Sequence, residues 1–380
     1  MKIAVLGTRG FPGVQGGVEA HCENLYPRLA ELGCDVTAFT RAPYVNPNIK
    51  EYKNVKLYSL TCPKTKALET LVHTFKGVFA ARRMNPDILH IHAIGPSLFA
   101  PLARILGMKV VITNHGPDYK RKKWGYLGKT ALVLGETLGT AYANEIICIS
   151  GHIARHIYRI YGREGTLIPN GVVMPKIVED ETTLRKYGLD KGKYILAVGR
   201  FVPEKGFHDL IGAFDRLYSM KEGRDGFEWG SIDGWKLVLV GRPDHEDRYS
   251  LGLKKTAQEN ENMILTGFLT GAALKELYIH AGLFVLPSYY EGLSITLLEA
   301  MSYGLSCIAS DIPANREVAL PDERYFKAGD VKGLADKMRK FMTMRLNEGE
   351  RQRMTDLVKK KYDWDDIAAR TMSVYKKAVG

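Results

Sequence analysis

Two carboxylates, Glu291 and Glu299, lie eight positions apart in the mostly apolar stretch Ser288–Gly304. Ser294 is a good N-cap for a helix that begins at Ile295. That helix has almost no polar face, so Glu299 points either into packed surroundings or toward a ligand. A buried carboxylate needs hydrogen-bond donors, and the two vicinal hydroxyls of a ribose would supply them. Beside Glu291 we expect open backbone N–H groups at Gly292, Leu293 and Ser294.

The same two carboxylates admit a second interpretation, in which they act as an acid and a base that cut a glycosidic bond. Eight residues apart on one loop and helix, they are poorly placed to flank a sugar. We therefore favour ligand binding over glycoside hydrolysis.

Two cations follow a predicted strand in the segment AVGRFVPEKGF, residues 197–207. Arg200 and Lys205 are five positions apart across a turn that contains Pro203 and Gly206. Arginine supplies a fork of donors and lysine a point charge, which together suit a diphosphate. The alternative is that both are surface charges of an ordinary turn.

A glycine pair, Gly16–Gly17, comes directly before an expected helix. The spacing of the preceding loop is not GxGxxG, so the dinucleotide fingerprint is absent. Glycines at a helix N-terminus let an anion approach free N–H groups. A flexible loop before a helix is the other interpretation.

Several histidines and aspartates are candidates for further roles. His115 follows the strand KVVITN, near Asp118, where it would bond a sugar or acceptor or serve a structural role. His90 and His92 alternate along one strand and share a face, but no third metal ligand is evident. The DxD pattern in DWDD, residues 363–366, is better explained by Asp363 or Asp365 as a helix N-cap. We expect no metal site.

Short β-branched runs alternate with helix-length segments, which predicts parallel sheets covered on both faces. Expected helices include Gly17–Leu32 and Pro96–Leu106. The pattern restarts after IPNGVVMPK, residues 168–176, so we expect two doubly wound domains, 1–172 and 173–363, with 364–380 returning to the first. The predicted strands are Ile3–Leu6, Val36–Phe39, Ile88–His92, Val110–Thr113, Ile146–Ile149, Tyr194–Val198, Lys236–Val240, Met263–Leu265, Leu283–Leu286 and Ser306–Ala309.

The composition is that of a soluble globular protein. The chain of 380 residues is 45% hydrophobic and 25% charged, and no apolar run reaches the length of a membrane span. The N-terminus runs directly into a strand pattern, so we expect no signal peptide. Five scattered cysteines without a CxxC pair are typical of reduced thiols. We expect a cytoplasmic protein.

The net positive charge is concentrated in the first half of the chain. Residues 1–190 contain 25 Lys and Arg against 15 Asp and Glu, whereas the rest contain 29 against 27. The segments 63–83 and 119–124 are the basic clusters, and the first predicts an amphipathic helix with Lys64, Lys66, Lys76, Arg82 and Arg83 near its ends. Such a helix either lies on an anionic bilayer or forms a solvated face. No nucleic-acid motif is present.

Taken together, these motifs resemble glycosyltransferase family 4. EGLSITLLEAMSYG is similar to the family's E-x7-E motif, Arg200 and Lys205 match its R-x4-K, and QGGVE and IPNGV resemble its glycine-rich loop and interdomain segment. The similarity covers essentially the whole chain. The pairing of GTRGFPGVQGGVE with KRKKW resembles the branch that contains bacterial rhamnosyltransferases. Leu293–Ser294 departs from the Phe–Gly of many members and leaves the donor sugar open.

This resemblance implies the GT-B fold, in which two Rossmann-like domains face each other across a cleft and a C-terminal helix crosses back. It implies that Glu299 binds the ribose, that Glu291 and the following amides hold the donor sugar, and that Arg200 and Lys205 neutralise the diphosphate. Gly16 and Gly17 would approach the phosphates, and His115 the sugar. Gly267 and Phe268 are candidates for the base pocket.

The function we infer is a retaining, metal-independent glycosyltransferase without a cofactor. It would use a nucleoside-diphosphate sugar, dTDP-rhamnose or a UDP-sugar, and a lipid-linked saccharide acceptor for surface polysaccharide. An anionic membrane surface is the other expected partner, through the basic first domain. The rivals are a sugar-nucleotide epimerase and a non-catalytic binder of nucleotides or polyanions.

Overall fold

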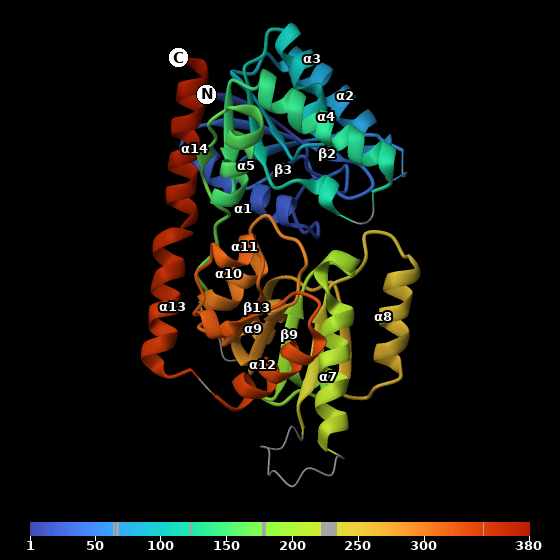
Figure 1. Ribbon diagram of the computed structural model, residues 1–380. Helices are drawn as coiled ribbons and strands as arrows, with labels where there is room; N and C mark the ends of the chain where they lie inside the picture. The colour runs from blue at the N-terminus through green and yellow to red at the C-terminus, as the bar shows by residue number, and fades with distance from the viewer. Residues whose placement is uncertain (64, 66–67, 122–123, 177–179, 222–233, 345) are drawn as a thin grey trace. The chain divides into compact units, whose positions relative to one another are not determined.

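The computed structural model describes residues 1–380 except 64, 66–67, 122–123, 177–179, 222–233 and 345. The chain divides into two units, Met1–Gly171 with Tyr362–Gly380, and Val172–Lys361. Each unit has a largely parallel sheet with helices around it (Figure 1). The predicted α/β class with two doubly wound domains is thereby confirmed.

The first unit contains an eight-stranded sheet in the order β3-β4-β2-β1-β5-β6-β7-β8. Its pairs are parallel apart from the antiparallel pair of β3 and β4. The bounds are β1 Lys2–Leu6, β2 Asp35–Arg41, β3 Glu51–Tyr52, β4 Val55–Leu60, β5 Ile88–His92, β6 Val110–Asn114, β7 Glu145–Cys148 and β8 Thr166–Leu167.

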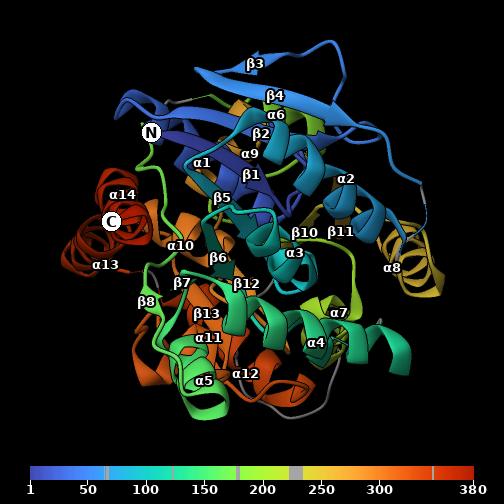
Figure 2. The same ribbon diagram turned by 90° about the horizontal axis from the view of Figure 1, so that it is seen from above.

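The helices of this unit cover both faces of the sheet. They are α1 Gly17–Glu31, α2 Leu68–Met84, η1 Pro96–Phe99 with α3 Ala100–Ile105, η2 Asp118–Lys120, α4 Tyr126–Tyr142, α5 Gly151–Tyr161 and α14 Trp364–Val379. The connections through α2, α3 and α4 all step in the same direction across the sheet, whereas α1 steps back from β1 to β2. Because such crossovers are right-handed, α2, α3 and α4 share one face and α1 lies on the other. Figure 2 shows the first three side by side.

The last helix, α14, belongs to the first unit, as predicted. It packs against α1 and against β5, β6 and β7. Trp364, Ile367 and Tyr375 are buried in the same hydrophobic core as Ile3 and Val5 of β1. Asp363 caps the helix, since its Oδ1 accepts hydrogen bonds from the N–H groups of residues 365 and 366 at 2.9 and 3.1 Å. This capping confirms the structural explanation of the DWDD pattern.

The second unit contains a six-stranded parallel sheet in the order β11-β10-β9-β12-β13-β14. The strands are β9 Tyr194–Val198, β10 Lys236–Val240, β11 Met263–Gly267, β12 Leu283–Leu286, β13 Cys307–Ser310 and β14 Tyr325–Phe326. The helices are α6 Thr182–Tyr187, η3 Pro203–Lys205, α7 Phe207–Lys221, α8 Arg248–Gln258, α9 Gly271–His280, α10 Ile295–Ser302, α11 Pro313–Arg316, η4 Asp322–Arg324, α12 Val331–Thr343 and α13 Glu348–Lys361.

The sheet of the second unit brings two distant parts of the sequence together. Strands β9 and β12 are direct neighbours, with Leu283 opposite Ile195 and Phe284 opposite Leu196. Because the strands are parallel, the segments that follow them leave the sheet at the same edge. The turn with Arg200 and Lys205 therefore lies beside the loop with Glu291.

Candidate functional site

The turns after β9 and β12 are in direct backbone contact. The N–H of Tyr289 donates to the carbonyl of Glu204 at 2.9 Å. Gly206 has a positive φ of 67°, and a Cβ at this position would lie 2.1 Å from the carbonyl oxygen of Pro287. Only glycine satisfies both the backbone conformation and this close approach. The glycine thus holds Lys205 against the loop that contains Glu291.

Both predicted cations are ion-paired. Lys205 Nζ lies 2.6 Å from Glu291 Oε1, and that oxygen also accepts a hydrogen bond from Ser288 Oγ at 2.6 Å. Arg200 lies 2.7 Å from Asp244 Oδ2. All four charged side chains are mostly, though not fully, buried. The structure therefore places a carboxylate against each cation.

Glu299 is partly buried on α10. Its Oε2 accepts a hydrogen bond from the hydroxyl of Tyr278 on α9 at 2.9 Å. Burial raises the pKa of Glu299 to about 7, and the Tyr278 hydrogen bond opposes that rise only in part. The carboxyl is thus poised to take up or lose a proton near neutrality, a property typical of functional sites.

The residues between the two carboxylates shape the start of α10. Ser294 is the N-cap, and its Oγ accepts a hydrogen bond from the N–H of Leu297 at 3.4 Å. This confirms the predicted cap. The side chains of Leu293 and Ser294 are buried, while Gly292 is partly exposed. This hydrogen bond fixes Ser294 at the start of α10, three residues after Glu291.

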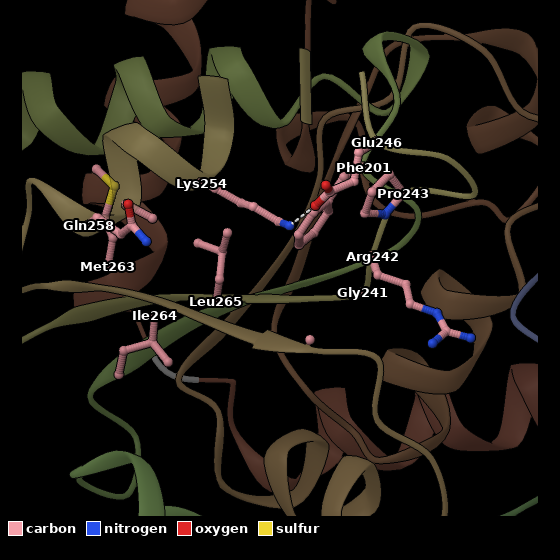
Figure 3. Close-up of a pocket in the computed structure, with 12 residues that line it drawn as sticks. Phe201, Gly241, Arg242, Pro243, Glu246, Lys254, Gln258, Met263, Ile264 and Leu265 are labelled. Carbon is pink, nitrogen blue, oxygen red and sulfur yellow. Dashed lines mark hydrogen bonds and ion pairs between the residues drawn. The ribbon is translucent and has the colours of Figure 1, made fainter. Parts of the chain in front are cut away.

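A pocket of about 700 Å³ in the same unit lies between helix α8, strand β11 and the segment that follows β10 (Figure 3). Gly267 is one of its lining residues, and Phe268 follows at the end of β11. The guanidinium of Arg242, also in the lining, lies 5.2 Å from the centre of the Phe268 ring. Arg200, Lys205 and Glu299 are not among the lining residues. The pocket therefore adjoins one predicted pair of residues and not the others.

The two glycines of the predicted pair, Gly16 and Gly17, are not equivalent. A Cβ at Gly16 would lie 2.0 Å from Glu19 Oε2, whereas nothing lies within 4 Å of a Cβ at Gly17. The Glu19 carboxylate pairs with Arg9, at 3.2 Å from Nε. Burial would raise the pKa of Glu19, but the charge and hydrogen bonds of Arg9 outweigh burial and lower it. Gly16 is thus explained by the buried Arg9–Glu19 pair, and Gly17 alone leaves open space for a ligand.

His115 is partly buried and belongs to a hydrogen-bonded chain with the buried His90 and His92 and two buried tyrosines. Its Nε2 lies 3.0 Å from Nδ1 of His92, whose Nε2 lies 2.5 Å from the hydroxyl of Tyr26. That hydroxyl is 2.9 Å from Nδ1 of His90, which also meets Tyr375. Burial, followed by repulsion from His90 and Arg121, lowers the pKa of His115 to about 3. The histidine is therefore neutral at physiological pH, with its Nε2 held by the protein.

A metal site at the paired histidines finds no support. Among the residues that the structure describes, no group of three or more His, Cys, Asp or Glu side chains is arranged to hold a metal ion. His90 instead bonds Thr113 Oγ1 through Nε2 at 2.7 Å. The shared face of His90 and His92 serves the buried network.

Three partners of the candidate residues are absent from the sequence-based prediction. They are Asp244, Ser288 and Tyr278, which bond Arg200, Glu291 and Glu299, respectively. Ser288 lies three residues before Glu291, so spacing could have suggested it. Asp244 and Tyr278 lie 44 and 21 positions from their partners and carry no local signal.

Comparison with known families identifies both halves of the chain. A model of "Glycosyl transferases group 1" matches residues 179–369, and a model of "Glycosyltransferase Family 4" matches residues 15–174. The protein belongs to the group 1 glycosyltransferases, with a family 4 first unit, and is a glycosyltransferase by class.

Individual relatives are similar along nearly the whole chain. An uncharacterised glycosyltransferase of Methanocaldococcus jannaschii is 26% identical, over 100% of this chain and 99% of its own. The phosphatidylinositol N-acetylglucosaminyltransferase gpi3 subunit of Schizosaccharomyces pombe is 24% identical, over 95% of this chain and 77% of its own. The structure of Anabaena HepE in complex with UDP-glucose has a TM-score of 0.75 at 17% identity, covering 98% of this chain and 99% of that one. The fold is GT-B.

Proposed function

We propose that this glycosyltransferase transfers a hexose or deoxyhexose, with retention of configuration, from a nucleoside-diphosphate sugar to a lipid-linked saccharide. The donor is a UDP-sugar or dTDP-rhamnose, and the product enters surface polysaccharide. The observation that carries the proposal is that Arg200, paired with Asp244, and the Lys205–Glu291 pair lie in the segments that follow the neighbouring strands β9 and β12. Parallel α/β sheets bind ligands at this edge.

Each candidate residue has a defined part in the reaction. The bond from the sugar C1 to the diphosphate oxygen breaks while an acceptor oxygen bonds C1 on the same face, and the departing phosphate takes the acceptor proton. Arg200 and Lys205 stabilise the charge that develops on that phosphate, in place of a metal ion. Glu299 accepts hydrogen bonds from the two ribose hydroxyls of a UDP-sugar, or from the single 3′-hydroxyl of the deoxyribose of dTDP-rhamnose, and Glu291 orients the donor sugar.

The ion pairs of the structure are compatible with this scheme. Asp244 and Glu291 form ion pairs with Arg200 and Lys205, so a diphosphate must displace one or both carboxylates to bind the cations. Because a diphosphate carries more charge than one carboxylate and accepts bidentate bonds from arginine, it is the stronger partner. Donor binding would then release Glu291 from Lys205 to bond the sugar.

Two relatives support the choice of substrates. HepE is described in complex with UDP-glucose, which favours a nucleotide-sugar donor. The gpi3 subunit belongs by name to a phosphatidylinositol N-acetylglucosaminyltransferase, which favours a lipid-linked acceptor. The rhamnosyltransferase branch, metal independence and a place on the inner face of the membrane are parts of the same proposal.

The test uses the variants Lys205→Ala and Glu299→Ala. We expect each to lose at least about a hundredfold in transfer from the donor that binds, as measured by release of nucleoside diphosphate, because a developing charge or the ribose loses its partner. Thermal shift with UDP and dTDP selects that donor. The matched control is Lys236→Ala, a lysine on β10 that bonds Gly188.

Full activity in either site variant would refute the site. Transfer should also persist in excess EDTA, and a complete loss that Mg²⁺ restores would refute the metal-free scheme. Formation of an epimer from the nucleotide-sugar alone would favour the epimerase rival.

A further inference from the structure

The first unit carries an exposed apolar surface on the helices α2, α3 and α4. Tyr126 and Leu127 begin α4 and are 85% and 83% exposed, and Ile105 at the end of α3 is 80% exposed. On α2, Leu68, Phe75 and Phe79 are exposed at helical spacing. We call these six residues the apolar face. Single exposed apolar residues are ordinary, and we interpret six of them on three adjacent helices as an interaction surface.

The six residues belong to helices on one face of the sheet. Leu68, Tyr126 and Leu127 begin their helices near the carboxyl edge of the sheet, whereas Ile105 ends α3 near the opposite edge. Helices α2, α3 and α4 share a face of the sheet, and α2 and α4 both pack against η1 (Figure 2). The ring of Phe75 lies 5.0 Å from that of Phe79 and 6.0 Å from that of Phe99 in η1. The aromatic side chains of α2 therefore form a row that extends to η1.

All the exposed charges of these three helices are positive. They are Lys76, Arg82 and Arg83 on α2, Arg104 on α3 and Lys129 on α4. The two acidic residues, Glu69 and Glu136, are buried and turned to internal partners. Arg41 lies 2.6 Å from Glu69, and Asn114, Tyr119 and Tyr161 donate to Glu136. The fold thereby turns every carboxylate of these three helices inward.

Aromatic and aliphatic side chains among lysines and arginines, without acids, match an anionic bilayer surface. The apolar groups bury into the boundary of head groups and acyl chains, while the cations remain with the phosphates. We propose that the α2–α3–α4 face docks this protein on an anionic lipid membrane, with Tyr126 and Leu127 inserted. This inference rests on the proposed function only in that a lipid-linked acceptor would be found at a membrane. It also names the surface that would meet the membrane, which the basic composition alone does not define.

The position of the face favours a lipid-linked acceptor. Helices α2 and α4 follow β4 and β6, so Leu68 and Tyr126 begin these helices near the carboxyl edge of the sheet. His115 follows β6 at the same edge. A bilayer that receives Tyr126 and Leu127 would thus lie beside the residues expected to meet the acceptor.

The test is co-sedimentation with vesicles of phosphatidylcholine alone and of phosphatidylcholine mixed with phosphatidylglycerol. We expect binding to the anionic vesicles, weakened by salt, and little binding to the neutral ones. Tyr126→Ser/Leu127→Ser should lower the partition coefficient about tenfold or more. Arg82→Glu/Arg83→Glu should lower it by at least about twentyfold.

Matched controls separate the face from general charge and hydrophobicity. Leu251→Ser/Met344→Ser removes two residues that are about half exposed in the second unit, and Lys359→Glu/Lys360→Glu reverses two exposed cations of α13. Both should bind as the unsubstituted protein does. Equal loss in the controls, or equal binding to neutral vesicles, would overturn the proposal.

Two further measurements distinguish membrane docking from self-association and from a defect in the donor site. A concentration-dependent dimer that Tyr126→Ser/Leu127→Ser abolishes, without vesicle binding, would assign the face to a second copy and overturn the proposal. The thermal shift by whichever of UDP and dTDP the unsubstituted protein binds should be the same in all face variants. Loss of vesicle binding with this thermal shift retained would locate the defect in the apolar face alone. Loss of transfer in Lys205→Ala with vesicle binding retained would concern the proposed function alone.

Discussion

At the scale of single residues, the candidate site is a set of charges held in partly buried pairs. Lys205 and Glu291 are 2.6 Å apart with little exposure, and Arg200 and Asp244 are 2.7 Å apart. Pairs of this kind contribute little net stability, because desolvation offsets the Coulomb attraction. A ligand with stronger anionic groups can therefore exchange with the carboxylates at small cost. Both pairs lie beyond the carboxyl ends of parallel strands, where α/β sheets bind ligands, and this position agrees with the proposed binding role.

Glu299 is predicted to reduce the stability of the ligand-free protein above neutral pH. Its pKa is about 7 in the fold against 4.5 for an ordinary glutamate, so the folded state binds its proton more tightly. The ionised group is therefore unfavourable in the fold above pH 7, and the effect disappears below about pH 4.5. Glu299→Gln should raise the free energy of unfolding by up to about 3 kcal/mol at pH 8.

Urea denaturation of the parent and of Glu299→Gln at pH 8 and pH 4.5 measures this difference. The nucleoside diphosphate that the parent binds, UDP or dTDP, should bind the variant more weakly at pH 8 even though the fold of the variant is more stable. A stability change of the same size at both pH values would contradict the assignment of the raised pKa to this carboxyl.

At the scale of elements, the neighbouring turns after β9 and β12 are held at close distance by a glycine. Gly206 and Gly188 share the left-handed backbone conformation, with φ of 67° and 57°. They differ in space, because a Cβ at Gly206 would meet the carbonyl of Pro287 at 2.1 Å, whereas the nearest atom at Gly188 is the end of the Lys236 side chain at 3.5 Å. Comparing alanine at the two positions therefore separates the cost of the left-handed backbone from the cost of a clash with the Pro287 carbonyl.

Gly206→Ala is expected to cost at least about 2 kcal/mol more than Gly188→Ala in the free energy of unfolding. In both variants the left-handed conformation of alanine costs about 1 kcal/mol. Only in Gly206→Ala must the new Cβ also displace the turn that contains Pro287. Urea denaturation measures the stability. Release of nucleoside diphosphate from the donor should also fall in Gly206→Ala alone, since Lys205 moves with the turn. Equal effects in the two variants would show that the contact with Pro287 is unimportant.

At the scale of the whole molecule, the two units differ in how their buried groups respond to acid. The first unit contains a cluster of the buried His21, His90 and His92 with the partly buried His115, in which the ring of His21 lies 5.5 Å from that of His92 and 5.2 Å from that of His115. Burial lowers the pKa of His21, His90 and His115 to about 3, and it also lowers the pKa of His92 well below 6.5. In the second unit, burial raises the pKa of Glu299 instead. Acid therefore weakens the first unit and favours the folded form around Glu299.

The histidine cluster is predicted to make the first unit unfold first in acid. These pKa values are lowered from the ordinary 6.5, so the unfolded state binds more protons below pH 6.5. Stability is complete above that pH and is lost as pH falls toward 3, by up to about 1.4 kcal/mol per pH unit for each histidine. Equilibration in urea at pH 7 and pH 5, followed by hydrogen-exchange labelling at one common pH, measures this.

Amides of β5 and β6 should lose protection at pH 5 in less urea than at pH 7. Those of β9 and β12 are the internal control and should shift little. A common shift in both units would indicate a cause outside the histidine cluster.

Much of the fold follows from local patterns. The strands Ile88–His92, Tyr194–Val198, Lys236–Val240 and Leu283–Leu286 have the predicted bounds, because each is a short β-branched or apolar run between turn residues. Strand β4, Val55–Leu60, is absent from the predicted strands. The first four residues of β4, Val55–Tyr58, alternate between buried and exposed. This alternation is short and lies in a polar stretch, so it is a weaker signal for a strand than a continuous apolar run.

Local sequence alone predicts which residues stand at strand ends, that Ser294 and Asp363 cap helices, and that the first half of the chain carries most of the net positive charge. These properties depend on neighbours a few positions away. The tertiary structure decided that Lys205 pairs with Glu291 across 86 positions and that the only acids of α2 and α4 point inward. Both depend on the order of strands in a sheet and on which helix face meets it, and these are set by contacts between segments that lie far apart along the chain.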